Sequence, residues 1–291
     1  MLKKLVYTLS ATAMIFTASC SKNNDGDSTD KPVIAVSIAP LADLVETICG
    51  DDCEIVTLLD RGANPETFDP AMSKRAAAEK SDIYFMLDAF PFEKTVIGNR
   101  DGVIDVSTGI ERLYGTHSHN HSDGDNHHHH EMEADPHSWT SAKNMKIIAS
   151  NIGQAMIKYD SKNADTYSTR LDSLTAVIDS LDQALTARLD SAPTKSFAIW
   201  HPSLGYFARD YGLKQIAVGE ESKEISPLRL KETINKAIAD SVKVFFFQKE
   251  FDSRQAYSVN DRLGARMVTI DPLAADWIGQ LNLIADELSS N

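Results

Sequence analysis

The fold of this chain is indicated first by residues 33–59, which read VIAVSIAPLADLVETICGDDCEIVTLL. The β-branched run Val33–Ile38 is followed by a helical pattern at Leu41–Ile48 and by a second β-rich run at Glu54–Leu59. Short strands that alternate with helices are typical of βαβ units with parallel strands. This segment therefore predicts the beginning of a parallel α/β sheet.

The same alternation continues in two series along the chain. The first series predicts further strands at 82–87 and 103–106, with helices at 71–80 and 92–97. The second series predicts strands at 196–200, 214–218, 242–247 and 266–270, with helices at 203–211, 228–240, 254–263 and 275–288. We therefore expect an α/β fold with two parallel-sheet lobes, residues 32–160 and residues 193–291.

A long helix is predicted between the two lobes. After a shorter helical pattern at 141–159, apolar side chains recur at steps of three and four: Tyr167, Leu171, Leu174, Ile178, Leu181, Leu185 and Leu189. At a rise of 1.5 Å per residue such a helix spans about 35 to 40 Å, which is enough to join two lobes. We expect residues 161–192 to form this linking helix, and the alternative is a helix packed on one lobe only.

Residues 1–19 have the features of an export signal, because two lysines precede the nearly uncharged segment Leu5–Ala18. That segment is shorter than the roughly 20 residues of a membrane-spanning helix. The sequence Thr17-Ala18-Ser19-Cys20 resembles a bacterial lipobox, although Thr17 stands where Leu is usual. We expect lipidation at Cys20, a tether at residues 20–31, and a chain exported and anchored to a bacterial membrane, periplasmic or at the cell surface. The alternative is an ordinary signal peptide.

Two further cysteines, Cys49 and Cys53, lie close together in the sequence. In an oxidising, exported setting such a pair is a candidate disulfide that ties a turn. The alternative is a pair of metal ligands, but no nearby His or third Cys completes a ligand set.

The composition argues against nucleic acid as a partner. The formal net charge is −13, and a negative chain repels phosphates and offers no basic surface to bind them. The hydrophobic content of 42% and the charged content of 24% are ordinary for a globular protein.

Seven of the nine His lie in the polar segment 116–135. This segment has too few apolar side chains to pack a core, so we expect a loop in the first lobe. Its imidazoles would form a low-affinity auxiliary metal collector: His117, His119, His121, His127, His128, His129 and His130. The alternative is an inert solvated segment.

Candidate ligands of a tighter metal site follow the predicted strands directly, where ligands bind in parallel sheets. His201 follows the strand that ends at Trp200, Asp271 follows Ile270, and Glu66 lies in the loop after Leu59. His137 follows the His-rich segment, just before a predicted helix. The alternative role of Asp271 is to cap a helix, and the alternative for Glu66 is a solvated acid in a loop.

Two imidazoles and two carboxylates suit Zn²⁺, with Mn²⁺ or Fe²⁺ as alternatives, and do not suit Cu⁺, which prefers sulfur. The two carboxylates balance a divalent cation, and four protein ligands leave tetrahedral zinc no open position, which favours binding over catalysis. The enzymatic alternative is a metal-dependent hydrolase in which Glu66 is the general base. No His-Glu-x-x-His helix or nucleophile motif supports that alternative.

Four segments resemble one family, in order and spacing: Gly62-Ala63-Asn64-Pro65-Glu66-Thr67-Phe68, Pro136-His137-Ser138-Trp139, His201-Pro202-Ser203-Leu204-Gly205-Tyr206-Phe207-Ala208 and Asp271-Pro272-Leu273. They are similar to the zinc and manganese solute-binding lipoproteins of ABC importers, and the resemblance covers about Val33 to Leu288. It implies two α/β lobes joined by a long helix, with the metal in the cleft between the lobes. The metal ligands implied are Glu66, His137, His201 and Asp271.

The chain departs from the family pattern at two positions. Glu66 stands where a His is usual, and Gln248 stands where a Glu is often found near the site. A set of two His and two acids is often of the manganese type, whereas the His-rich loop favours zinc. The resemblance also implies a monomer that delivers its metal to an ABC-transporter permease. The remaining alternative is a metal-buffering or adhesin surface lipoprotein without a transporter.

Overall fold

The computed structural model describes residues 31–97, 101–114, 134–219, 226–251 and 253–290. The predicted signal peptide, Cys20 and the tether up to residue 30 lie outside the described residues, and so do the seven His of the predicted loop. Within the described part of the chain, no helix combines the length and the apolar character needed to cross a membrane.

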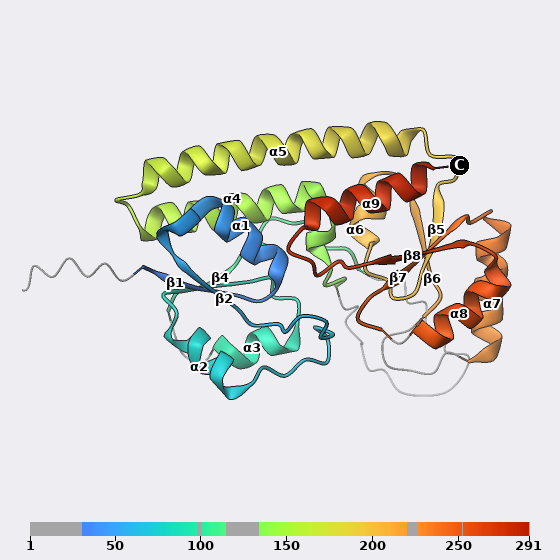
Figure 1. The fold of residues 1–291 in the computed structure, drawn as a ribbon, viewed down its shortest axis with the longest axis horizontal. Coiled ribbons are helices and arrows are strands. Elements are labelled where there is room, and N and C mark those ends of the chain that lie inside the picture. The colour runs from blue at the N-terminus through green and yellow to red at the C-terminus, as the bar shows by residue number, and fades with distance from the viewer. Residues whose placement is uncertain (1–30, 98–100, 115–133, 220–225, 252, 291) are drawn as a thin grey trace, which may run out of the picture. The chain divides into compact units, whose positions relative to one another are not determined.

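The N-terminal lobe is built on a sheet of four parallel strands in the order β2-β1-β3-β4. The strands are β1 (Val33–Val36), β2 (Glu54–Thr57), β3 (Ile83–Met86) and β4 (Val103–Asp105). They are connected by α1 (Ala39–Cys49), the 3-10 turn η1 (Gly50–Asp52), α2 (Met72–Lys80) and α3 (Pro91–Ile97). Helix α1 covers one face of the sheet, and α2 and α3 cover the other (Figure 1).

The C-terminal lobe repeats this arrangement with the strand order β6-β5-β7-β8, again all parallel. The strands are β5 (Ser196–Ile199), β6 (Lys214–Ala217), β7 (Val244–Gln248) and β8 (Arg266–Ile270). The helices are α6 (Gly205–Asp210), α7 (Pro227–Ala239), α8 (Ser253–Leu263) and α9 (Trp277–Ser289). The predicted α/β fold with two parallel-sheet lobes is confirmed.

The two lobes are joined by η2 (Ser138–Thr140), α4 (Ala142–Tyr159) and α5 (Ala164–Asp190). Helix α5 packs on α4 and α1 and also on α9, so it contacts helices of both lobes (Figure 1). Its predicted apolar stripe faces inward, and all of its side chains are buried except Leu171, which is partly buried. The long helix is therefore a connector between the lobes rather than a helix of one lobe alone.

A single apolar core extends through both lobes, from Ile34 in β1 to Leu288 in α9. A second, smaller core lies in the C-terminal lobe and includes Ile234 of α7 and Val259 of α8. Because the main core is continuous from lobe to lobe, the two lobes are held together by packing and not only by the connecting segments.

The turn after α1 carries a disulfide between Cys49 and Cys53. Arg170 of α5 donates hydrogen bonds to the carbonyl oxygens of Ile48 and Cys49 and pairs with Asp52. The turn is thus tied to the connecting helix.

Helix and strand ends differ slightly from the predicted ones. Helix α1 begins at Ala39, two residues earlier than predicted, because Pro40 occupies its first turn, where a missing N–H costs nothing. Helix α9 begins later, at Trp277, because the side chain of Asp276 caps it by accepting a hydrogen bond from the N–H of Gly279.

Candidate metal centre

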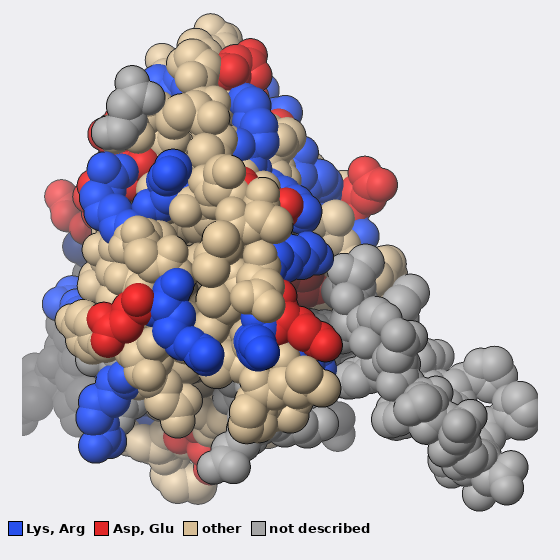
Figure 2. Space-filling view, turned by 90° about the vertical axis from the view of Figure 1, so that its right-hand side faces the viewer, with Lys and Arg blue, Asp and Glu red and all other residues tan. Residues whose placement is uncertain are grey.

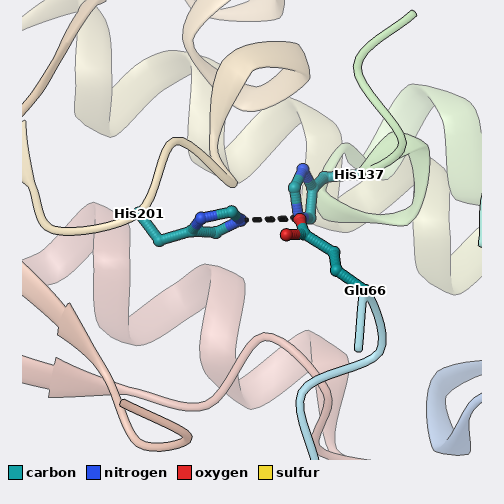
Figure 3. Close-up of side chains that lie close together, drawn as sticks. All are labelled: Glu66, His137 and His201. Atoms are coloured by element: carbon teal, nitrogen blue, oxygen red, sulfur yellow. Dashed lines mark hydrogen bonds and ion pairs between the residues drawn. The ribbon is translucent and has the colours of Figure 1, made fainter. Parts of the chain in front are cut away.

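Three of the predicted ligands, Glu66, His137 and His201, meet at one point (Figure 3). The two Nε2 atoms of His137 and His201 lie 3.2 Å apart. Glu66 Oε1 lies 3.2 Å from His201 Nε2 and 3.8 Å from His137 Nε2. Ligand atoms held at 2.0 to 2.2 Å around one tetrahedral ion lie about 3.3 Å from one another, so the three atoms are spaced as ligands of a single ion.

The three side chains come from separate segments that the fold brings together. Glu66 lies in the loop between β2 and α2, where its N–H donates to Asn64 Oδ1 at 2.9 Å and tightens the turn. His137 immediately precedes η2, and His201 follows β5. Both imidazoles are buried, and the Glu66 side chain is 16% exposed.

Asp135 orients the His137 ring. Its Oδ1 atom lies 2.9 Å from both the backbone N and the Nδ1 atom of His137. Because an ionised carboxylate can only accept, Nδ1 is the protonated nitrogen of the ring, and the unprotonated Nε2, on the side of Glu66 and His201, carries the lone pair that a metal ligand needs. A Cβ atom on Gly205 would lie 2.4 Å from Asp135 Oδ2, so this glycine makes room for the carboxylate.

Gln248 holds the backbone of His201 and does not reach the ligand atoms. Its Nε2 donates to the carbonyl oxygen of His201 and to Ser203 Oγ, and its Oε1 accepts from the N–H of His201. A glutamate could not make both donations when ionised, which gives a physical reason for Gln at this fully buried position. On the other side, the Phe251 ring stacks on the His201 ring with centroids 5.2 Å apart.

Asp271, the fourth predicted ligand, is not among the three side chains that meet. Its carboxylate lies 3.6 Å from Lys249 Nζ, and its N–H donates to Gln280 Oε1 at 2.8 Å. It does not cap α9 either, because Asp276 does. The following residues Pro272 and Leu273 do line the cavity at the three ligands.

Glu250 lines that same cavity and was missed by the sequence analysis. Burial raises the pKa of its carboxyl to about 7, and the nearby Asp271 and Glu66 add to the shift, while its own N–H and His137 oppose it. The sequence does carry a signal for it. Glu250 is a polar residue a few positions past the predicted strand end at Phe247, where ligands of parallel sheets bind.

The cavity itself is small. Its volume of about 10 Å³ fits one water-sized sphere. Besides Glu66, His137, His201 and Glu250, the residues Trp139 and Phe251 contribute to its lining. Trp139 is fixed by a hydrogen bond of 2.8 Å from its Nε1 to the carbonyl oxygen of Pro272. The space beside the three ligands is thus of the size of a single ion or water molecule.

The family model described as zinc-uptake complex component A, periplasmic, matches residues 34–290. The chain belongs to this family. Its members are solute-binding proteins that bind a metal and deliver it to an ABC importer. The predicted family and the predicted metal-binding transport function are therefore confirmed.

Relatives in this family are similar to nearly the whole chain. The high-affinity zinc uptake system protein ZnuA of Bacillus subtilis is 26% identical over 275 residues, covering 90% of this chain and 86% of that protein. A metal ABC transporter substrate-binding lipoprotein of Lactococcus lactis is 25% identical over 278 residues, covering 89% and 85%. A crystal structure of ZnuA superposes with a TM-score of 0.79 at 29% identity, covering 89% of this chain and 98% of that one.

Proposed function

We propose that this member of the zinc-uptake family captures one divalent transition-metal ion, zinc in first place, between Glu66, His137 and His201. The observation that carries the proposal is the triangle of ligand atoms, with edges of 3.2, 3.2 and 3.8 Å, at an ion-sized cavity. Two imidazoles favour zinc, whereas the carboxylate of Glu66 leaves Mn²⁺ and Fe²⁺ as alternatives.

The experiment is a competitive titration of zinc and manganese at neutral pH against a chelator of known affinity. Wild type should bind one zinc tightly. Glu66→Gln removes an anionic ligand and should weaken binding of both metals, while Glu66→His should restore zinc binding and favour zinc over manganese, because imidazole is the softer ligand. Glu79→Gln changes an exposed acid of the same lobe and serves as the matched control. If Glu66→Gln bound both metals as tightly as wild type, Glu66 would be a loop acid only.

We further propose that the chain is a lipoprotein anchored through Cys20 and that it hands its metal to an ABC permease as a monomer. The family and the lipoprotein name of the Lactococcus lactis relative support this. Cys20→Ser should move the protein from the membrane fraction to the soluble fraction of cells that express it. Retention of the variant in the membrane fraction would contradict the anchor.

The role of the His-rich segment as an auxiliary metal collector stays a prediction. Deleting residues 116–133 should remove weak metal sites and keep the tight one, because none of Glu66, His137 and His201 lies in it. Calorimetric titration separates the two classes of site, and loss of the tight site would contradict the ligand assignment.

A further inference from the structure

The loop that carries Glu66 connects the end of β2 at Thr57 to the start of α2 at Met72. Glu66 points from this loop toward the two imidazoles (Figure 3). Its N–H bond to Asn64 Oδ1 tightens the local turn. The place of its carboxylate, 3.2 Å from His201 Nε2, depends in addition on how the loop is fixed to the rest of the lobe.

The start of this loop is held by Lys74, in the first turn of α2. The Lys74 Nζ atom donates to the carbonyl oxygens of Thr57 at 3.1 Å and Leu58 at 2.9 Å, and it lies 2.6 Å from Asp60 Oδ1. The lysine side chain is 29% exposed, so these charge-assisted bonds are partly shielded from water. The carbonyl oxygen of Asp60 accepts from the N–H of Ala63, which extends the anchored segment into the loop.

The end of the loop is held by the next residue of the helix, Arg75. Its Nε donates to the carbonyl oxygen of Pro70 at 2.9 Å, and its Nη2 pairs with Asp69. Just before these anchor points the ring of Phe68 packs edge-on against Phe92, with centroids 5.5 Å apart. A short stretch of the loop, with the carboxylate ligand in it, thus lies between two anchored segments.

Anchors of this kind lower the entropic cost of metal capture. A loop that is held loosely loses backbone freedom when its carboxylate is fixed on an ion. A loop that is held near its bound conformation has lost that freedom on folding, so more of the interaction energy appears as affinity. The Asp69 side chain is 78% exposed, and exposed ion pairs contribute little. We therefore expect Lys74 to contribute more than Arg75.

We propose that Lys74 and Arg75 are positioning residues for metal capture, which clamp the two ends of this loop and pre-organise the Glu66 carboxylate toward His137 and His201. The inference rests on the proposed function, because Glu66 is a ligand there. The two cations act through the loop and not through contact with the ion.

The test measures the zinc dissociation constant of the full chain by chelator competition at neutral pH. Lys74→Met keeps the aliphatic stem and removes the charge and the donors, so it should weaken binding by about 10- to 100-fold, as for residues that orient a ligand. Arg75→Met should weaken binding less. Lys74→Arg keeps a charge and donors and should lie closer to wild type than Lys74→Met. Lys80→Met changes an exposed cation at the end of the same helix, and this control should bind zinc as wild type does.

A double-mutant cycle shows whether the clamp acts through Glu66. In the Glu66→Gln background, Lys74→Met should cause a much smaller further loss, because the ligand that it positions is already removed. A merely structural role would give the same fold-loss in both backgrounds, and that result would overturn the proposal. Unchanged affinity in both Lys74→Met and Arg75→Met would overturn it as well.

Amide hydrogen exchange of the metal-free protein reads the clamp directly. The N–H groups of Ala63, Glu66 and Thr67 are hydrogen-bonded within the loop. Their exchange should be faster in Lys74→Met than in wild type, while exchange in β5 stays the same. Unchanged exchange of the loop amides would count against the clamp. Thermal melts check that the variants fold, and Arg75→Met carries the same cycle if Lys74→Met does not fold.

Failure of the proposed function looks different from failure of this inference. If wild type bound no zinc tightly, or if Glu66→Gln had no effect, the proposed site itself would be wrong. If Glu66→Gln weakened zinc binding while Lys74→Met and Arg75→Met did not, the site would stand and the clamp alone would be refuted.

Discussion

At the residue scale, two side chains outside the proposed ligand set hold its histidines in place. Asp135 accepts from Nδ1 of His137 and Gln248 holds both backbone polar groups of His201. Such partners fix the tautomer and the direction of a ligand ring, and their loss typically costs 10- to 100-fold in metal affinity.

Asp135→Asn should weaken zinc binding by about 10- to 100-fold, because an amide can donate to Nδ1 and so allow the tautomer whose Nε2 carries the proton. In the absence of metal, the free energy of unfolding should be nearly the same for this variant as for wild type. Chelator competition gives the affinity and urea unfolding gives the stability. Asp105→Asn is the control, since Asp105 also accepts from a backbone N–H, that of Ser107, but takes no part in the metal centre. Equal zinc affinity of Asp135→Asn and wild type would contradict the orienting role.

Gln248→Leu should lower both stability and zinc affinity, because it leaves the buried N–H and carbonyl of His201 without their side-chain partner. We expect a loss of about 1 to 3 kcal/mol of unfolding free energy for the unsatisfied groups and about tenfold in affinity. The control is Gln215→Leu, which removes one hydrogen bond to the N–H of Leu204 in the same lobe. Wild-type affinity in Gln248→Leu would show that His201 is held by packing alone.

At the element scale, the junction of α4 and α5 is fixed by one carboxylate. Asp160 ends α4, and its Oδ2 accepts from Asn163 Nδ2 at 2.7 Å and from the Tyr167 hydroxyl at 3.0 Å. The hydrogen bond from Asn163 is the largest influence that lowers the pKa of Asp160 below its usual value. Burial, followed by Asp160 itself, raises the pKa of Tyr167 to about 12. The start of the connecting helix is thus set by charge-assisted hydrogen bonds.

Asp160→Asn should therefore destabilise the protein in a pH-dependent way. A folded-state pKa below the unfolded one means that Asp160 adds stability at pH values above about 4 and that this contribution is lost as the pH falls through the lower, folded pKa. We expect a loss of about 1 kcal/mol at pH 7 that shrinks as the pH falls below about 4 and through the lower, folded pKa. Urea unfolding of wild type and variant at several pH values measures it, with the exposed Asp172→Asn of α5 as control. A difference that did not depend on pH would contradict the charged hydrogen bond.

At the scale of the whole molecule, acidic charge is distributed unevenly. Residues 32–160 contain 21 Asp and Glu against 10 Lys and Arg, whereas residues 193–291 contain 13 against 12. Figure 2 looks at the outer end of the C-terminal lobe, where Lys and Arg side chains are spread over the face. The potential that attracts cations is therefore concentrated on the N-terminal lobe.

The captured metal should also stabilise the whole described fold, because its ligands come from segments that the shared core brings together. Binding to the folded state alone adds about 4 kcal/mol when free metal exceeds the dissociation constant by about a thousandfold, which raises the melting temperature by roughly 8 to 16 °C. Scanning calorimetry with zinc should show this rise in wild type and little of it in His201→Gln, and magnesium is the control metal. An equal rise in His201→Gln would place the stabilising zinc elsewhere.

The sequence by itself determined the elements and their order. The apolar stripe from Tyr167 to Leu189 and the β-branched runs are local patterns, and local periodicity is what decides between helix and strand. The resemblance and the strand-end positions also singled out Glu66, His137 and His201, which the fold brings within 3.8 Å. Periodicity does not fix the ends of helices, since a cap such as Asp276 depends on one side chain.

Only the tertiary structure decided which groups beyond those three line the cavity of the candidate site. Glu250 and Asp271 both follow strands of one sheet, yet Glu250 lines the cavity and Asp271 pairs with Lys249. Gln248 supports the His201 backbone and does not reach the cavity. The direction of a side chain just past a strand depends on how the chain turns there and on what packs against it, and no local pattern in the sequence encodes those contacts.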